Sequence, residues 1–272
     1  MPTRPRFVPF GSLTASGLSP IFMTANTADT KSAGNNEGWE VDMIGRLRSL
    51  GLVLAVLGIV FVAAGGYAFL KTQEGTQSLN ALSAAQNVKL SYNQQGQLVD
   101  RGETAGAEAI MSLLKNDWKY PVNTSELNPN DPVVNTASEY MYQMATITFH
   151  TLNSTQTVVL PADVTAADGT VYKAGSYDFP VAGRYWSAFN RSNPIEAAAR
   201  EKAWTGTAHG LIAELGVGTA TATALQLGLG IAGLFAGLGF FALISGFGLV
   251  WATRAQTETA PKRALQPTAV PA

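Results

Sequence analysis

Two histidines are the first residues to consider for chemistry, because imidazole titrates near neutral pH and is a common metal ligand. His150 lies near the end of a predicted helix, and His209 precedes a long apolar run. Together they could form a proton relay, a quinone contact or half of a metal site. Separate surface or interface positions are the simpler interpretation, because no third ligand is spaced at helical reach. His150 also suits a helix C-terminus, which stabilises a cation.

Serine, lysine and carboxylate groups are the remaining candidates for catalysis. Ser112-x-x-Lys115 falls in the last turn of a predicted helix rather than ahead of one, and the sequence lacks a Gly-x-Ser-x-Gly motif. Several carboxylates could form an acid–base pair or hold Ca²⁺: Asp117, Glu126, Asp131, Asp163 and Asp168. Their spacing matches no Ca²⁺ loop and is typical of turns. We therefore predict a protein that is not an enzyme, with no catalytic residue, metal or cofactor.

The composition is typical of a membrane protein. Only 14% of the 272 residues are charged, whereas soluble domains carry about 25%. The chain has no Cys, which excludes disulfides and thiolate metal sites, and its formal charge of −1 gives no basic surface for nucleic acid. Two long uncharged apolar runs account for the shortage of charge. We therefore expect membrane lipid as a partner and no nucleic acid.

The two apolar runs, residues 50–70 and 227–250, have the length of transmembrane helices. At about 1.5 Å per residue they extend roughly 31 Å and 36 Å, against a hydrocarbon thickness of about 30 Å. Tyr67 and Trp251 lie near their ends, where amphipathic aromatic rings favour the membrane interface. Two buried helices of a soluble protein are the alternative, but such a chain would have to surround both runs.

Basic residues next to the runs set the orientation. Arg46 and Arg48 precede the first run, and Arg254 follows the second. The positive-inside rule places both termini in the cytoplasm and the central part outside, as in a multi-pass plasma-membrane protein. The predicted organisation is a disordered cytoplasmic segment (1–43), a first transmembrane helix (44–71), an extracytoplasmic domain (72–222), a Gly-rich second transmembrane helix (223–252) and a disordered cytoplasmic tail (253–272).

A cleaved signal peptide is the alternative for the first run, because Met43 and the two nearby arginines resemble its charged start. The run continues for 21 residues, whereas the apolar part of a signal peptide has about 7–15, so we expect it to remain as an anchor. Met43 could also be the true start of translation.

The extracytoplasmic part is long enough for one domain with its own core. Its pattern predicts an α+β fold, mainly helical with small β-hairpins. The expected elements are an extension of the first helix (71–86), a short hairpin around 94–96, helices at 103–116 and 131–151, strands at 155–160 and 170–179, and a helix from Asn193 through Trp204. Asp131 and Asn193 are the expected N-caps, each followed by Pro. Glycines between residues 206 and 218 could break or bend the path to the second run.

A cluster of aromatic and basic residues is the candidate contact surface of this domain. Its members are Arg184, Tyr185, Trp186 and, farther along, Trp204. They could form domain core, or a surface for lipid headgroups, a glycan or a partner protein, because Trp, Tyr and Arg contribute much of the energy of interfaces.

Small residues in the two runs predict close helix packing. The second run contains Gly233-x-x-x-Gly237, a spacing that lets another helix backbone approach closely. The candidate helix-packing residues are Gly51, Ala55, Gly228, Ala232, Gly233, Ala236, Gly237, Ala242 and Gly246. We expect the two runs to pack together and the surplus of small residues to serve a further partner, either another membrane protein or a second copy of this chain.

The layout resembles that of uncharacterised two-span membrane proteins of actinobacteria. The segments that carry the resemblance are AEAI (107–110), DPVVNTASEYMYQMATITFHTL (131–152) and TGTAHGLIAELGVGTATA (205–222), within roughly residues 43–252. It implies an actinobacterial envelope protein. Some of these proteins carry an automatic aromatic ring-opening dioxygenase label. Non-haem iron would need His and carboxylate ligands around an open site, which these residues do not provide, so no catalytic residue is carried over.

The function expected from these features is association in the membrane. The chain would be an accessory or structural subunit of a larger envelope or respiratory membrane complex, or a homo-oligomer. The alternative is a membrane-anchored module whose outer domain binds or senses a lipid, a peptide or a cell-wall ligand.

Overall fold

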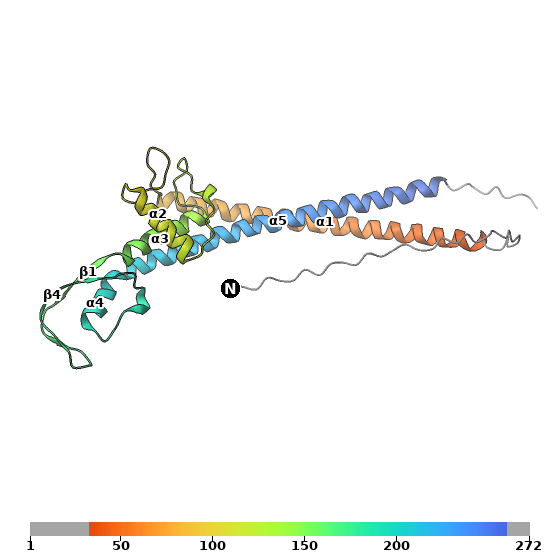
Figure 1. The fold of residues 1–272 in the computed structure, drawn as a ribbon. Coiled ribbons are helices and arrows are strands. Elements are labelled where there is room, and N and C mark those ends of the chain that lie inside the picture. Colours follow the sequence, from red (N-terminus) through yellow and green to blue (C-terminus); the bar gives the residue numbers. More distant parts are fainter. Residues whose placement is uncertain (1–32, 260–272) are drawn as a thin grey trace, which may run out of the picture.

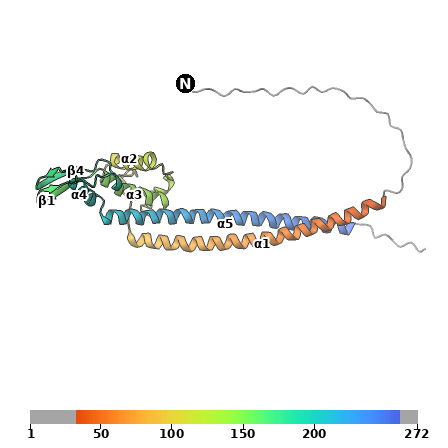
Figure 2. The same cartoon turned by 90° about the horizontal axis from the view of Figure 1, so that it is seen from below.

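Two helices of 54 residues each, α1 (Ala33–Gln86) and α5 (Gly206–Thr259), form the long axis of the molecule. They run antiparallel and side by side in the computed structural model, which describes residues 33–259 (Figures 1 and 2). At about 1.5 Å per residue each extends about 81 Å, well beyond the thickness of a bilayer. The helix α1 begins at Ala33, within the segment 1–43 expected to be disordered. The expectations for residues 1–32 and 260–272 lie outside the described residues.

Both long helices are apolar enough, over a sufficient length, to cross a membrane. Only 17% of the most apolar window of each is buried in the structure, whereas a core helix of a soluble protein is mostly buried. Val56, Phe241 and Ile244 are examples, with exposed fractions of 61%, 71% and 73%. The protein is therefore mostly helical, with two long helices whose apolar surface is largely uncovered.

Both helices continue beyond the apolar runs on the same side. The extension of α1 to Gln86 is confirmed, and it adds about 24 Å beyond residue 70. The helix α5 is continuous from Gly206, about 31 Å before residue 227, so the glycines between residues 206 and 218 do not interrupt it. Of these glycines Gly218 lies against Tyr140 of α3, whereas no atom lies within 4 Å of a Cβ placed on any of the others. At the last residue of α1, the side chain of Gln86 donates a hydrogen bond to Glu214 of α5.

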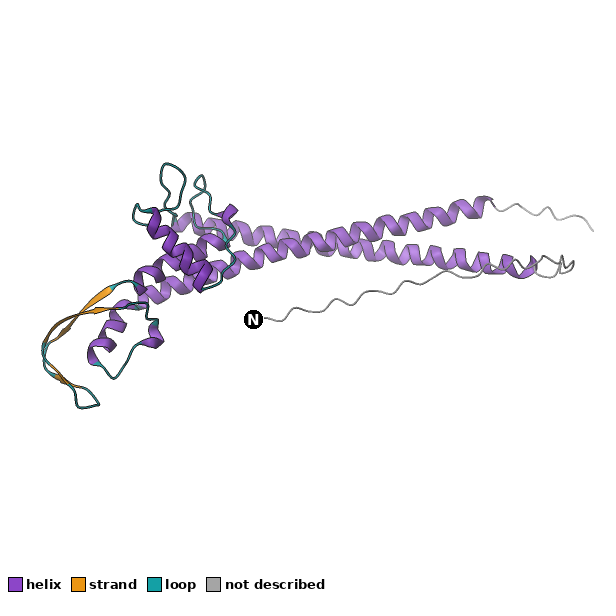
Figure 3. Ribbon diagram, in the orientation of Figure 1, coloured by secondary structure: helices purple, strands orange, loops and turns teal. Residues whose placement is uncertain are grey.

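A head built on these extensions contains the remaining elements (Figure 3). The helical ones are α2 (Thr104–Ser112), η1 (Leu113–Asp117), η2 (Thr124–Glu126), α3 (Ala137–Leu152), η3 (Trp186–Ala188) and α4 (Pro194–Ala203). The helix predicted at 103–116 is confirmed as α2, and its last turn widens into the π-helix η1. The main core lies between α2 and α3 and where α3 packs on α5, and its fully buried side chains include Ile110, Leu114, Ala145 and Val181.

The start of α3 differs from the prediction. The expected N-cap was Asp131, but the helix begins at Ala137, after Thr136. Thr136 and Glu139 form a capping box, in which the Glu139 carboxylate accepts the Thr136 backbone N–H at 2.9 Å. The preceding residues pair with the chain after α1 instead, since Val134 N–H donates to the Val88 carbonyl at 2.9 Å. The capping box and this pairing together outweigh the Asp-Pro signal.

The strands form two small antiparallel sheets at the end of the head that lies farthest from the apolar runs. The strand β1 (Thr155–Leu160) is confirmed as predicted and pairs with β4 (Gly175–Pro180). The strand predicted at 170–179 is divided, because β3 (Val171–Tyr172) pairs separately with β2 (Val164–Thr165). The short hairpin predicted around 94–96 is reduced to one bridge between Tyr92 and Leu98.

The helix α4 covers the inner side of β1. Its predicted N-cap is confirmed, since the Asn193 side chain accepts hydrogen bonds from the backbone N–H groups of Ile195 and Glu196. Ile195 and Ala199 pack with Val158 of β1 in a second, smaller core. This contact holds the strand pair against the rest of the head.

Candidate functional site

Glycines that recur every seven residues form the contact between α1 and α5. Gly51, Gly58 and Gly65 of α1 are buried against α5. A Cβ atom placed on Gly58 would lie 2.8 Å from the carbonyl oxygen of Gly239, so only glycine permits this backbone separation. A seven-residue period keeps such a contact on one side of both helices. The same close approach joins Gly51 to Gly246, Gly65 to Ala236 and Gly239 to Val62.

The predicted helix-packing residues divide into two groups. One group is buried or partly buried at the contact between α1 and α5 and comprises Gly51, Ala55, Gly228, Ala232, Ala236, Ala242 and Gly246. Gly233 and Gly237 are exposed instead, and no other atom lies within 4 Å of a Cβ placed on either. Gly58, Gly65 and Gly239 were missing from the prediction, although the seven-residue spacing in the sequence could have found them.

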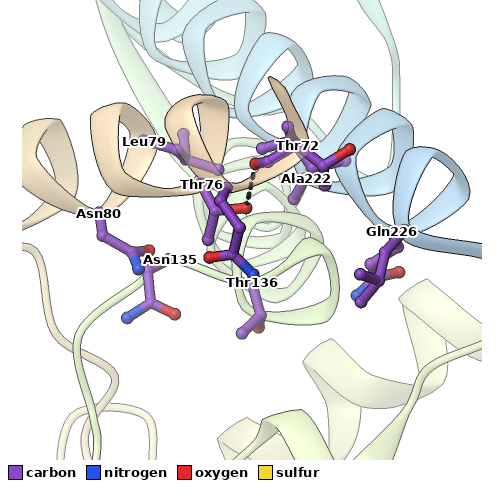
Figure 4. A pocket seen from close by; sticks show the side chains of 11 residues that line it. Thr72, Thr76, Leu79, Asn80, Asn135, Thr136, Ala222 and Gln226 are labelled. Carbon is purple, nitrogen blue, oxygen red and sulfur yellow. Dashed lines mark hydrogen bonds between the residues drawn. The ribbon is translucent and has the colours of Figure 1, made fainter. Parts of the chain in front are cut away.

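A hollow of about 350 Å³ lies where the head meets the helix pair, and we call it the junction pocket. Three parts of the chain line it: α1, α5 and the loop before α3 (Figure 4). The lining residues are Thr72, Gln73, Thr76, Leu79, Asn80, Asn135, Thr136, Ala222, Leu225, Gln226 and Leu229. None of them is ionisable, so the pocket offers hydroxyl, amide and apolar groups only.

The predicted aromatic cluster is brought together, and His209 of α5 joins it. The Tyr185 and Trp204 rings stack with centroids 5.8 Å apart. His209 lies 5.1 Å from Trp186 and 5.7 Å from Trp204, centroid to centroid. Of these side chains Trp204 is 5% exposed and Tyr185 42% exposed. The cluster therefore packs between the head and the start of α5, with Trp204 buried and Tyr185 and His209 at its surface.

Two arginines fix the edge of this aromatic cluster. The guanidinium of Arg200 lies 4.0 Å from the centroid of the Trp186 ring, which is a cation–π contact. Arg184 lies over Phe179 at 5.1 Å, and its backbone carbonyl accepts the Trp204 indole N–H at 3.1 Å. Arg184, Trp186 and Trp204 of the predicted contact surface are therefore already in contact with other residues of the head.

The two histidines lie apart and have different partners. His150 Nε2 lies 2.9 Å from Asp100 Oδ1 at the surface of the head, whereas His209 belongs to the aromatic cluster. Within the described residues, no group of three or more His, Cys, Asp or Glu side chains could hold a metal ion.

Ser112 is bound by the side-chain amide of Asn116 at 2.9 Å rather than by Lys115.

The loop carboxylates are engaged in turns and surface pairs. Asp163 accepts from Lys173 Nζ and from the Ala174 backbone N–H, both at 2.8 Å, and these contacts lower its pKa. Asp168 accepts the Thr170 backbone N–H at 2.9 Å, which lowers its pKa as well. Asp131 and Asp117 are exposed loop and helix-end residues. These contacts agree with the turn roles predicted for the loop carboxylates rather than with the acid–base or Ca²⁺ alternatives.

Glu126 and Glu139 are the carboxylates with structural roles. Burial raises the pKa of Glu126, but hydrogen bonds from Ser138, Gln226 and Asn123 outweigh it and hold the pKa below its usual value. Glu126 thereby links the first turn of α3 to α5, since it accepts Ser138 N–H at 2.8 Å and Gln226 Nε2 at 2.9 Å. Burial dominates at Glu139, which is 1% exposed, and raises its pKa.

Comparison with known proteins adds nothing to these observations. No family model, curated protein or solved structure matches this chain. The resemblance to two-span actinobacterial proteins therefore stays a prediction.

Polar side chains of the head cap its helices and join it to the pair of long helices α1 and α5, which we call the stalk, as Glu139 and Glu126 do. The surfaces left without a partner inside the described chain include the apolar faces of the long helices, the exposed glycines of α5 and the junction pocket.

Proposed function

We propose that this chain is a two-span plasma-membrane protein that acts by association rather than catalysis. Both termini would lie in the cytoplasm, and the head would stand outside on the extensions of α1 and α5. The exposed side chains of residues 50–70 and 227–250 support membrane insertion, because lipid is the solvent that suits such a surface. The orientation is supported by the arginines that flank the two runs. Membrane lipid is then one partner, and a further transmembrane helix is the other.

A single observation carries the association. The helix α5 has two faces of small residues, and only one of them contacts α1. Gly230, Gly233 and Gly237, at spacings of three and four residues, lie on the exposed side with no atom within 4 Å of an added Cβ. Small residues on a lipid-exposed face allow close backbone approach by another helix. The protein would thus be a homo-oligomer or the accessory subunit of a larger envelope or respiratory complex.

Site-specific cross-linking in native membranes tests this proposal. The chain has no Cys, so each variant carries one reactive thiol. Gly237→Cys places the thiol on the glycine face, and Leu238→Cys places it at the same depth on another exposed face, about 100° around the helix. A second copy or a partner on the glycine face would give a discrete cross-linked product from Gly237→Cys and little from Leu238→Cys. Equal yields from both variants would contradict the proposal.

Insertion and orientation need a separate measurement. Alkaline carbonate should leave the protein in the membrane, and protease added to intact spheroplasts should cleave within residues 71–226. Release by carbonate, or protection of the central region from protease, would refute the membrane topology irrespective of the cross-linking result.

A further inference from the structure

The junction pocket has polar side chains along its length, and two leucines of α5 form an apolar end next to the apolar run. Leu225 and Leu229 of α5 line one end, and Leu229 belongs to the apolar run. Asn80 of α1 and Asn135 of the loop before α3 line the other end (Figure 4). Asn80 is about 12 Å farther along α1 than Thr72, which follows the end of the first run. With residues 50–70 in hydrocarbon, the pocket spans the boundary between the bilayer and its polar surface.

The polar side chains along the pocket are able to bind hydroxyl groups. Within the described chain, the side-chain amides of Asn80 and Asn135 have no hydrogen-bond partner, although both line the hollow. The hydroxyl of Thr72 donates to the Ala68 carbonyl and that of Thr76 to the Thr72 carbonyl, both at 2.9 Å. Each threonine oxygen therefore keeps its capacity to accept. Amide donors and hydroxyl acceptors in one wall match a ligand whose groups both donate and accept.

The absence of charge in the lining selects against an anionic ligand. None of the residues that line the pocket is a lysine, an arginine or a histidine. A phosphate held there would lose water without gaining a cation, which is costly. Uncharged hydroxyl groups have a smaller desolvation cost, and the available amides can repay it. The volume of about 350 Å³ is within the range of pockets for small ligands.

We propose that the junction pocket holds the uncharged, hydroxyl-bearing headgroup of a membrane lipid, with Asn80 and Asn135 binding its hydroxyls and the acyl chains leaving along Leu225 and Leu229. The source is a lipid rather than a dissolved sugar because the apolar end of the pocket continues into the lipid-facing run. This inference rests on the membrane insertion proposed above and is independent of association through α5.

Lipid retention by the full-length protein tests the proposal. The protein is placed in phosphatidylcholine nanodiscs that contain either glucosyl diacylglycerol or phosphatidylglycerol, and native mass spectrometry counts the lipids that remain bound. The variants are Asn80→Leu and Asn135→Leu, whose amides make no bonds in the protein, so folding is spared. Gln77→Leu is the control, because Gln77 is an exposed amide of α1 outside the pocket.

The wild type and Gln77→Leu should retain glucosyl diacylglycerol in preference to phosphatidylglycerol. Each pocket variant should retain about tenfold less of it, the effect of losing a hydrogen-bonded amide. Equal retention of the two lipids by the wild type, or unchanged retention by both variants, would overturn the proposal. Methyl glucoside binding as tightly as the glycolipid would assign the pocket to a soluble sugar and overturn it as well. Carbonate extraction, measured in parallel, separates this failure from failure of membrane insertion.

Discussion

The phenolic hydroxyl of Tyr140 lies 2.7 Å from the hydroxyl of Ser83, in the buried junction between the head and the stalk. Tyr140 belongs to α3 and Ser83 to α1, and their residues are 4% and 1% exposed. The other side of the Tyr140 ring lies against Gly218 of α5. One side chain of the head therefore contacts both long helices, and it fixes the position of α3 relative to the pair.

Removal of the Tyr140 hydroxyl should weaken this junction. We expect Tyr140→Phe to lower the free energy of unfolding of the head by about 1 kcal/mol, because a buried hydrogen bond is lost while the ring packing stays. Ser83→Ala should cost a similar amount, and the double variant less than the sum. Thermal unfolding in detergent, followed by tryptophan fluorescence, measures all three. Strict additivity would show that the two hydroxyls do not interact.

A methyl group at Gly218 should have a larger effect. Its Cβ would lie 2.6 Å from Cε1 of Tyr140, so the ring and α3 must move away from α5. Gly218→Ala should therefore destabilise the head by about 1–3 kcal/mol, as overpacking does. Gly216→Ala is the matched control, because no atom lies within 4 Å of its Cβ, and it should be neutral or stabilising. Equal melting temperatures for the two variants would contradict the contact.

The glycine contact between the long helices is tested in the same way. Gly58→Ala would place a Cβ 2.7 Å from Cγ of Leu243 and should push α1 and α5 apart. Gly66→Ala, also in the first apolar run, has open space around its Cβ and should leave the pair unchanged. Spin labels on the two helices, with distances measured by electron paramagnetic resonance, report the separation. A spacing that Gly58→Ala leaves unchanged would refute the contact.

Acid should weaken the attachment of the head through Glu126. Its pKa is lower in the folded protein than in the unfolded chain, because its hydrogen bonds outweigh the effect of burial. Its stabilisation is therefore present above the unfolded pKa of about 4.3 and is lost as the pH falls through the folded pKa. The melting temperature of Glu126→Gln should fall less steeply with acid than that of the wild type.

An exposed carboxylate on α2 supplies the control for this pH dependence. Glu108→Gln should leave the fall of the melting temperature with acid as in the wild type, since Glu108 makes no hydrogen bond to the described chain. A Glu126→Gln curve parallel to that of the wild type would show that Glu126 does not contribute to the acid loss.

Local signals in the sequence predicted local structure well. The extent of α1 beyond the first apolar run, the strand β1 and the Asn193 cap of α4 are confirmed, because each depends on residues close together in the chain. The predicted start of α3 was wrong. Asp131 and Thr136 both fit an N-cap, and the choice depended on Val88 pairing with Val134, which local sequence does not encode.

The candidate sites were predictable as residue types but not as contacts. Arg184, Tyr185, Trp186 and Trp204 were recognised as a group, yet the sequence left open whether they form core or surface. His209 joins them because α5 starts beside the head. The junction pocket gave no motif at all, since its lining residues come from three separate segments.

The sequence alone determined that two stretches of this chain are long, uncharged and apolar, and that small residues are abundant in the second. Those properties depend only on composition and on the thickness of a bilayer. The tertiary structure decided which glycines face α1 and which remain exposed, and which amides line the junction pocket. Those outcomes depend on the rotation of α5 about its axis and on the position of Tyr140 between α1 and α5. Both are set by long-range packing.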